Sequence, residues 1–131
     1  MKKILVDTSI WIEYFKGKEA AASIINDNTG FDLFITGPIL TELVQGIKTE
    51  SEKELFTKLM ESFPRIAILE QDWVDAGKTG SELRKNGVTV PMADLLIYTV
   101  SINNSCALFT LDKHFNLINE TIDPDLEIID L

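Results

Sequence analysis

Short continuous apolar runs alternate along this chain with longer segments in which apolar residues recur every three or four positions. The short runs, several of them rich in β-branched residues, predict buried strands, and the longer segments predict helices. The predicted strands cover residues 3–6, 33–36, 66–69, 106–110 and 127–130. The predicted helices cover residues 11–17, 18–28, 51–63, 72–86 and 91–103, with a further helix that opens at Pro38.

Strands and helices therefore alternate from one end of the chain to the other. This order is typical of a parallel sheet that is covered by helices on both faces. At 131 residues the chain has the length of one domain with a single buried core. We expect an α/β fold, a three-layer α/β/α sandwich with a mainly parallel sheet of about five strands. We expect residues 1–131 to form it as a single domain.

Local signals indicate where several of these helices begin. Thr8 or Ser9 is suited to cap the first helix, and the Ser-Glu-Lys-Glu sequence from Ser51 resembles a capping box. Pro38 fits the first turn of its helix, where a backbone N–H has no partner to lose. The helix that begins at Pro91 is apolar on nearly every side. We therefore expect that helix to be buried.

Four acidic residues lie inside or directly after apolar runs, where a carboxylate is costly unless something pairs with it. They are Asp7, Glu42, Asp94 and Asp112. Asp7 and Asp112 directly follow the first and fourth predicted strands, while Glu42 and Asp94 lie about one turn into predicted helices. Because ligands of open parallel sheets bind beyond the carboxyl ends of the strands, all four can face one rim. Together they would form an all-oxygen pocket suited to Mg²⁺ or Mn²⁺.

The charge balance limits what the surface can bind. There are 21 acidic and 12 basic residues, for a net charge of −9. Nonspecific binding of nucleic acid needs Lys and Arg to displace counterions from phosphates, so this balance argues against it. A net negative chain suits a protein that holds cations or one that has a basic protein partner.

Several protein classes are excluded by composition. No run approaches the roughly 18 apolar residues that span a bilayer. The basic start Met1-Lys2-Lys3 is followed by only three apolar residues, so a signal peptide is not expected. The single cysteine, Cys106, excludes an internal disulfide and a cysteine-based zinc site, and its apolar surroundings favour a core position. We expect a cytoplasmic protein that does not enter a membrane.

Four segments around the acidic residues resemble the motifs of the PIN-domain ribonucleases, and specifically those of VapC-type toxins from toxin–antitoxin pairs. They are residues 4–12, 41–43, 90–97 and 109–115. Each motif alone is weak, because a strand that ends in Asp is common. Their occurrence in family order, on a chain of the family's size, covers essentially the whole sequence.

The resemblance assigns the acidic quartet of the family to Asp7, Glu42, Asp94 and Asp112. It implies a metal-dependent endoribonuclease that uses one or two Mg²⁺ or Mn²⁺ ions. Asp7 and Asp94 are then expected as direct metal ligands, and Asp112 as a direct or water-mediated one. Glu42 would orient a water molecule. Where some family members carry a further carboxylate, this chain has Asn116, so its site could hold less charge or fewer ions.

The resemblance also implies supporting hydroxyl groups and partners. The hydroxyls are those of Thr8 or Ser9 and of Thr110. The expected partners are an RNA substrate, with tRNA or another structured RNA favoured, and a cognate antitoxin that binds a homodimer. The aromatic residues around Trp11 are expected in the core, although a partly exposed portion could form a groove for such a partner.

Basic residues near the motifs could contact RNA. They are Lys16, Lys18, Arg84, Lys85 and Lys113, together with His114, the one histidine of the chain. The functional interpretation of His114 is a phosphate contact. Each of these residues also fits an ordinary solvated side chain, and the sequence alone does not select among them.

Each acidic residue, taken singly, has an ordinary structural explanation. Asp7 or Asp112 could only cap a helix, and Asp94 could only complement a helix dipole. Glu42 could be a solvent-facing helical residue. Four unrelated explanations for four residues in family order are much less economical than one shared site.

Other α/β proteins with an acidic rim fit the sequence less well. A signalling receiver domain needs a second acid beside Asp7, where Thr8 stands. It also needs an Asp after the third strand, where residues 69–71 are Leu-Glu-Gln, and a Lys after the fifth, where residues 130–131 are Asp-Leu. A haloacid-dehalogenase-like phosphatase needs an Asp at the position of Ser9. A non-catalytic metal- or protein-binding module stays an open alternative.

Overall fold

The sheet is parallel and places the first strand at its centre. A computed structural model describes residues 1–27, 30–122 and 126–131. Its strands are β1 (Lys2–Val6), β2 (Phe31–Thr36), β3 (Arg65–Ile66), β4 (Ala107–Phe109) and β5 (Ile128–Ile129). They lie in the order β3-β2-β1-β4-β5, and each neighbouring pair is parallel. All carboxyl ends of the strands therefore point to the same edge of the sheet.

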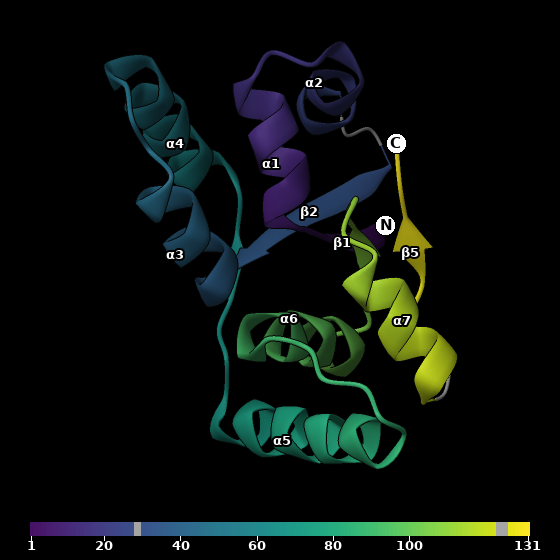
Figure 1. Ribbon diagram of the computed structural model, residues 1–131. Helices are drawn as coiled ribbons and strands as arrows, with labels where there is room; N and C mark the ends of the chain where they lie inside the picture. Colours follow the sequence, from purple (N-terminus) through teal and green to yellow (C-terminus); the bar gives the residue numbers. More distant parts are fainter. Residues whose placement is uncertain (28–29, 123–125) are drawn as a thin grey trace.

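Helices cover the sheet on both faces. They are α1 (Thr8–Phe15), α2 (Glu19–Asn26), α3 (Gly37–Gln45), α4 (Glu50–Ser62), α5 (Glu70–Lys85), α6 (Met92–Asn103) and α7 (His114–Thr121). In Figure 1, α1 and α2 lie on one side of the sheet, while α6 and α5 lie on the other. This arrangement confirms the predicted three-layer α/β/α sandwich. Within the described ranges, no helix has the length and apolar character needed to cross a bilayer.

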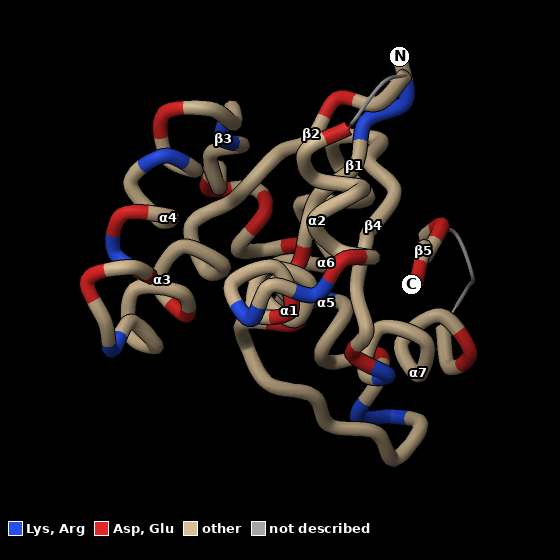
Figure 2. The backbone as a smooth tube through the Cα atoms, turned by 90° about the horizontal axis from the view of Figure 1, so that it is seen from above, with Lys and Arg blue, Asp and Glu red and all other residues tan. Residues whose placement is uncertain are grey.

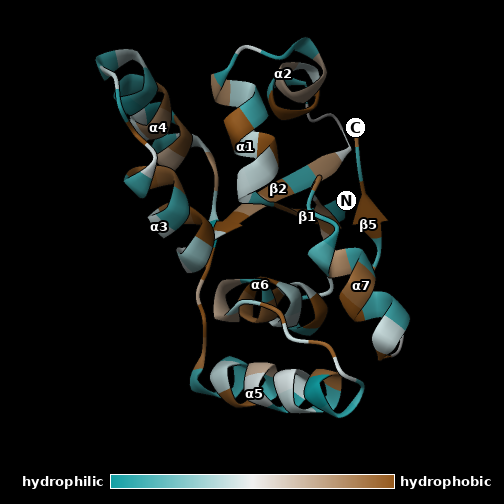
Figure 3. Cartoon of the chain, viewed as in Figure 1, coloured by the Kyte–Doolittle hydropathy of each residue, from teal (hydrophilic) through white to brown (hydrophobic). Residues whose placement is uncertain are grey.

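The core forms where the apolar runs of the sequence meet. Ile4, Leu5 and Val6 of β1 are buried, as is every residue of β4. Residues 96–101 of α6 are all buried, which confirms the prediction for this helix. In Figure 3, the outer helices α4, α5 and α7 carry alternating polar and apolar stripes, as expected for helices with one face on the core.

Trp11 anchors α1 to the sheet. Its side chain is fully buried, and its indole N–H donates to the backbone oxygen of Val6 at 3.0 Å. Its ring packs edge-on against Tyr14 and at a tilt against Phe63, with centroid distances of 6.0 and 5.5 Å. Tyr14 and Phe15 are partly buried against the same core. The aromatic cluster is thus mainly structural, as expected from sequence.

The third strand and the start of α5 differ from prediction. The strand is only Arg65–Ile66, and Leu69, expected within it, is 64% exposed and occupies the N-cap position of α5. The helix begins at Glu70 because the side chain of Asp72 accepts a hydrogen bond from the backbone N–H of Leu69 at 2.8 Å. The apolar run predicted as one strand, residues 66–69, therefore contains the end of a short strand and the residue that precedes a helix.

Two other predicted caps were wrong, and one helix was missed. Asp7, not Thr8 or Ser9, occupies the N-cap position of α1. Helix α4 begins at Glu50 because the Thr49 hydroxyl accepts from the backbone N–H of Glu52 at 3.2 Å, so Ser51 is already helical. Helix α7 was not predicted. The predicted end of the second helix, at residue 28, lies outside the described residues.

Asp72→Ala is expected to lower the free energy of unfolding by about 1–3 kcal/mol. The Asp72 carboxylate is 4% exposed, and besides Leu69 N it accepts from the Asn103 side chain at 2.8 Å, which ties α5 to the end of α6. Urea unfolding measures the change. Asp75→Ala is the control, because the half-buried Asp75 also accepts from Asn103 but caps no helix. Equal losses in the two variants would contradict the capping role.

Candidate metal-binding site

Four structural elements bring the acidic residues to the carboxyl edge of the sheet. Asp7 follows β1 and Asp112 follows β4, and these strands are direct neighbours. The backbone N–H of Asp7 donates to Phe109 O at 2.9 Å, which extends the pairing to the rim. Glu42 comes from α3 and Asp94 from the first turn of α6. The sequence prediction that all four can face one rim agrees with this arrangement.

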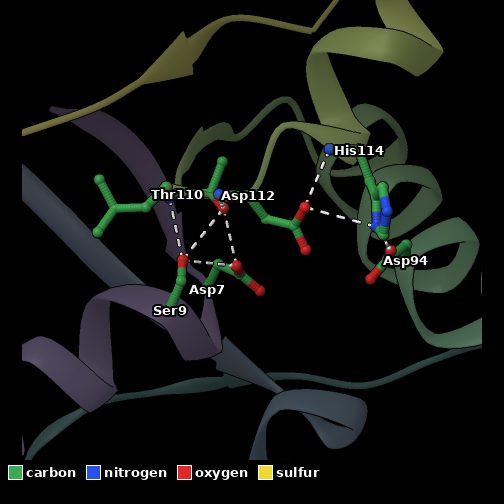
Figure 4. Close-up of polar contacts among 7 residues, drawn as sticks. Asp7, Ser9, Asp94, Thr110, Asp112 and His114 are labelled. Atoms are coloured by element: carbon green, nitrogen blue, oxygen red, sulfur yellow. Dashed lines mark hydrogen bonds and ion pairs between the residues drawn. The ribbon is translucent and has the colours of Figure 1, made fainter.

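Two hydroxyl groups hold the carboxylate of Asp7. The Ser9 hydroxyl donates to Asp7 Oδ2 at 2.9 Å, and the Thr110 hydroxyl donates to the same oxygen at 2.7 Å. The two hydroxyl oxygens lie 3.3 Å apart (Figure 4). Asp7 is 5% exposed and Thr110 is 2% exposed, so these hydrogen bonds compensate a carboxylate that is almost out of solvent. They also fix its orientation.

The same hydroxyls shape the segment that carries Asp112. Thr110 Oγ1 accepts from the backbone N–H of Asp112 at 3.0 Å, and Ser9 Oγ accepts from that of Leu111 at 3.0 Å. Thr8 acts elsewhere, because its hydroxyl donates to Glu42 Oε1 at 3.2 Å. The sequence left Thr8 and Ser9 as alternative supporting residues, and the structure gives a contact to each.

His114 lies between two of the carboxylates. Its ring Nδ1 is 2.7 Å from Asp94 Oδ2 and 3.4 Å from Asp112 Oδ1. Its backbone N–H also donates to Asp112 Oδ1, at 2.9 Å. Figure 4 shows the ring reaching from the start of α7 toward Asp94 on α6. The sequence suggested a phosphate contact for His114, but the structure turns its ring to the acidic residues.

The electrostatics of the carboxylates are those of a crowded site. Burial raises the pKa of the Glu42 carboxyl, and the hydrogen bond from Thr8 opposes that rise. The negative charges of the other three acids raise the pKa of Glu42 further. Burial likewise raises the pKa of Asp94, against the hydrogen bond from His114, and the charges of neighbouring acids add to the rise. Glu42 and Asp94 therefore sense the charges of neighbouring acids, and ionisation of the whole cluster is less favourable without a cation.

The donor set fits a divalent cation. One ligand atom each from Asp94, Asp112 and His114 lie within 4.8 Å of one another, and all three residues keep some exposure. Asp7 adds a nearly buried carboxylate whose Oδ2 is held by hydroxyls. Oxygen donors of this kind suit hard divalent ions, and a bound cation would offset the repulsion among the acids.

The basic residues selected from sequence fall into different places. Lys16 is exposed and lines a groove of about 570 Å³ that Glu42 also lines, between α1, α3 and the start of α4. Lys113 is exposed next to Asp112. Arg84 and Lys85 line a separate groove of about 560 Å³, formed by α5, the segment before α6 and Leu95. Figure 2 shows basic segments dispersed among acidic ones.

Sequence analysis missed how closely His114 joins the site. His114 stands two residues after Asp112, and this spacing was visible in the sequence. Its contact with the acidic residues can be inferred only when α7 is known to begin at His114. A helix that starts at His114 points the first side chain back toward the strand end. Asn116, two residues on, is half-buried on the same helix.

In metal-free protein, the pKa of His114 is expected to lie above its ordinary value. The hydrogen bond to Asp94 is the main cause, and the charge of Asp112 adds to it. This pairing stabilises the folded protein at pH values below the ordinary pKa of histidine, and the stabilisation is lost as pH rises through the raised pKa of His114. The effect is small because the His114 ring is half exposed. An NMR titration of the ring protons in EDTA measures the pKa. Asp94→Asn should lower it, and an unchanged value in that variant would contradict the pairing.

Comparisons with known proteins agree with this geometry. The family model described as PIN domain matches residues 4–120. The chain is similar to Ribonuclease VapC1 of Methanocaldococcus jannaschii, with 29% identity over 119 residues, which cover 90% of this chain and 82% of that protein.

Solved structures share the fold along the whole chain. One is VapBC2 from Rickettsia felis bound to a DNA fragment from their promoter, with a TM-score of 0.82, 18% identity and 98% of each chain covered. Another is DNA-bound VapBC from Salmonella typhimurium, with a TM-score of 0.81, 21% identity and 99% and 98% of the two chains covered.

The matched family segment contains the ends of β1 and β4 and the helices α3 and α6, so it includes all four acidic residues. The family resemblance inferred from the sequence motifs is therefore confirmed, and the chain belongs to the PIN domain family.

Proposed function

We propose that this protein is a metal-dependent endoribonuclease that hydrolyses RNA phosphodiester bonds, and that it is the toxin of a type II toxin–antitoxin pair. The observation that carries the proposal is the meeting of four carboxylates from four elements at one edge of the sheet, with Asp7 held by two hydroxyls. The similarity to a protein named a ribonuclease and to solved VapBC structures supports it.

Asp7, Asp94 and Asp112 would hold the cation, which we propose to be Mg²⁺ or Mn²⁺, as one or two ions. When bound, such a cation lowers the pKa of a coordinated water and offsets charge on the phosphodiester. The half-buried Asn116 adds no charge to α7, so a site with a single tightly held ion is compatible with this chain.

The remaining site residues would position these ligands and the water. Ser9 and Thr110 hold Asp7 Oδ2, which leaves Oδ1 to face the site. Thr8 holds Glu42 Oε1, so Oε2 can accept a hydrogen bond from a water molecule. Because the pKa of Glu42 is raised, this oxygen is also a better proton acceptor than an ordinary surface carboxylate.

The RNA would approach from the exposed side of the rim. Lys113 follows Asp112 in the chain, and Lys16 lines the groove that Glu42 also lines, so both are candidates to contact the RNA beside the acidic residues. Arg84 lines the other groove and would meet a more distant part of the substrate. A structured RNA such as tRNA suits a protein whose basic side chains are dispersed, because it presents phosphates at several separated points.

The proposed partners are a cognate antitoxin and a second copy of the chain, in the cytoplasm. A net charge of −9 favours a partner with a basic segment. Several structures that share the fold are described as toxin–antitoxin complexes or VapBC pairs.

Cleavage of a panel of total RNA and purified tRNA, with Mg²⁺, Mn²⁺ or EDTA, tests the nuclease. Discrete cuts that need metal and disappear in Asp7→Asn are expected, because this change keeps the shape of the side chain and removes its charge. If the wild type and the variant produce the same cuts, the activity comes from a contaminant. If metal binds but no RNA is cut, the module is non-catalytic and the proposed function is wrong.

A further inference from the structure

A nitrogen donor lies inside the acidic cluster. Nδ1 of His114 is 2.7 Å from Asp94 Oδ2 and 3.4 Å from Asp112 Oδ1. His114 is the only histidine of the chain, and the only cysteine, Cys106, is buried just before β4, at the other end of that strand from Asp112, so no other imidazole or thiol is available there. The position of this imidazole is thus a feature separate from the four carboxylates.

The three donor atoms are spaced like the ligands of one ion. Two donors with bonds of about 2.1 Å to one ion lie about 3.0 Å apart when they meet at a right angle. The two distances from Nδ1 bracket that value, and the three ligand atoms lie within 4.8 Å of one another. The His114 ring is half exposed, and Asp94 and Asp112 are also partly exposed, so these side chains have room to adjust around one ion.

The backbone holds this spacing in place. His114 is the first residue of α7, and its own N–H donates to Asp112 Oδ1, the oxygen that its ring faces. The backbone N–H of Asp112 is in turn fixed by Thr110 Oγ1. Ring and carboxylate are therefore positioned by one short, hydrogen-bonded segment, while Asp94 approaches from α6.

We propose that His114 ligates the cation of this site through Nδ1, beside Asp94 and Asp112, and that it shifts the metal preference from Mg²⁺ toward Mn²⁺ and other transition ions. The proposal rests on the metal site of the proposed function. An all-carboxylate set favours hard ions, whereas one imidazole among carboxylates adds affinity for transition ions that Mg²⁺ does not share.

Pulsed EPR of Mn²⁺-loaded protein without RNA is the direct test, because a coordinated imidazole gives a ¹⁴N coupling. We expect the coupling in the wild type and its loss in His114→Ala. Calorimetric titrations should show Mn²⁺ affinity falling by about 10-fold or more in that variant, with a smaller change for Mg²⁺. Glu120→Ala, an exposed acidic residue on the same helix, is the control and should behave like the wild type. Circular dichroism checks that the variants are folded.

Two results would overturn the inference. Mn²⁺ could bind to the wild type without a nitrogen coupling, or it could bind to a folded His114→Ala at least as tightly as to the wild type. Either result would mean that the imidazole only pairs with the carboxylates and is displaced by the ion. The failure of the nuclease proposal is distinct from these outcomes, since a nitrogen coupling in a protein that cuts no RNA would uphold His114 as a ligand while refuting the RNA substrate.

Discussion

Asp94→Asn is expected to lower the rate of RNA cleavage by about 10³-fold, because removing a charged metal ligand removes several kcal/mol of transition-state stabilisation. Asp94 interacts with several other groups of the rim. It contacts His114 directly, and its pKa responds to the charges of Asp112 and Asp7 as well as to burial. Asparagine has nearly the same shape, so the loss would reflect charge and coordination.

The same substitution should not destabilise the metal-free protein. Because the pKa of Asp94 is raised, the protonated form is favoured in the fold, and stability due to this group falls as pH rises through the raised pKa. At neutral pH the ionised carboxylate is therefore unfavourable, and a neutral amide relieves it. We expect the thermal stability of Asp94→Asn in EDTA to equal or exceed that of the wild type. Lost cleavage together with retained stability would distinguish a functional acid from a structural one.

Single-turnover cleavage and thermal unfolding in EDTA measure the two effects. Asp32→Asn is the matched control, because Asp32 lies near the start of β2, at the opposite edge of the sheet from the acidic residues. It should cleave like the wild type. If Asp94→Asn retained the wild-type rate, or if Asp32→Asn lost it equally, the catalytic assignment of Asp94 would be wrong.

The sequence was informative about the acidic residues because each one interrupts or ends an apolar run. Asp7 and Asp112 follow buried strands, and the alternation of strands and helices was sufficient to predict a parallel sheet. A parallel sheet sends all its carboxyl ends to one edge, so convergence followed from topology without any knowledge of strand order. The same alternation predicted the layers correctly.

Hydrogen-bond partners could not be predicted in this way. Thr8 and Ser9 are adjacent and chemically alike, yet Thr8 contacts Glu42 and Ser9 contacts Asp7, because consecutive residues of α1 point in different directions. Similarly, α7 has a short and weakly patterned sequence and was not predicted, so the position of His114 against Asp94 could not be predicted either. Local geometry of this kind is decided by tertiary contacts.

Thr110→Val is expected to weaken metal binding by about 10- to 100-fold, although Thr110 would not touch the ion. Its hydroxyl donates to Asp7 Oδ2 at 2.7 Å and accepts from the backbone N–H of Asp112 at 3.0 Å. One buried oxygen thus orients two acids. Valine keeps the volume and the β-branch, but it leaves Asp7 with only Ser9 as a hydroxyl donor and frees the segment that carries Asp112.

The cost in stability is expected to be about 1–3 kcal/mol, because polar groups near the core lose a hydrogen-bonding partner. Thr36→Val separates this cost from the effect on the site. Thr36 is also fully buried at the end of a strand, but its hydroxyl donates to the backbone oxygen of Ile66 at 2.8 Å. Both variants should therefore lose comparable free energy of unfolding, measured with urea.

Only Thr110→Val should then lose Mn²⁺ affinity in calorimetric titrations and cleavage rate at subsaturating metal. High metal concentrations should restore much of the rate, since the ligands themselves are still present. Equal losses of affinity in Thr36→Val would mean that the site responds to general destabilisation of the sheet edge. An unchanged affinity in Thr110→Val would mean that Ser9 alone orients Asp7, and that the Thr110 hydroxyl serves only to close the turn after β4.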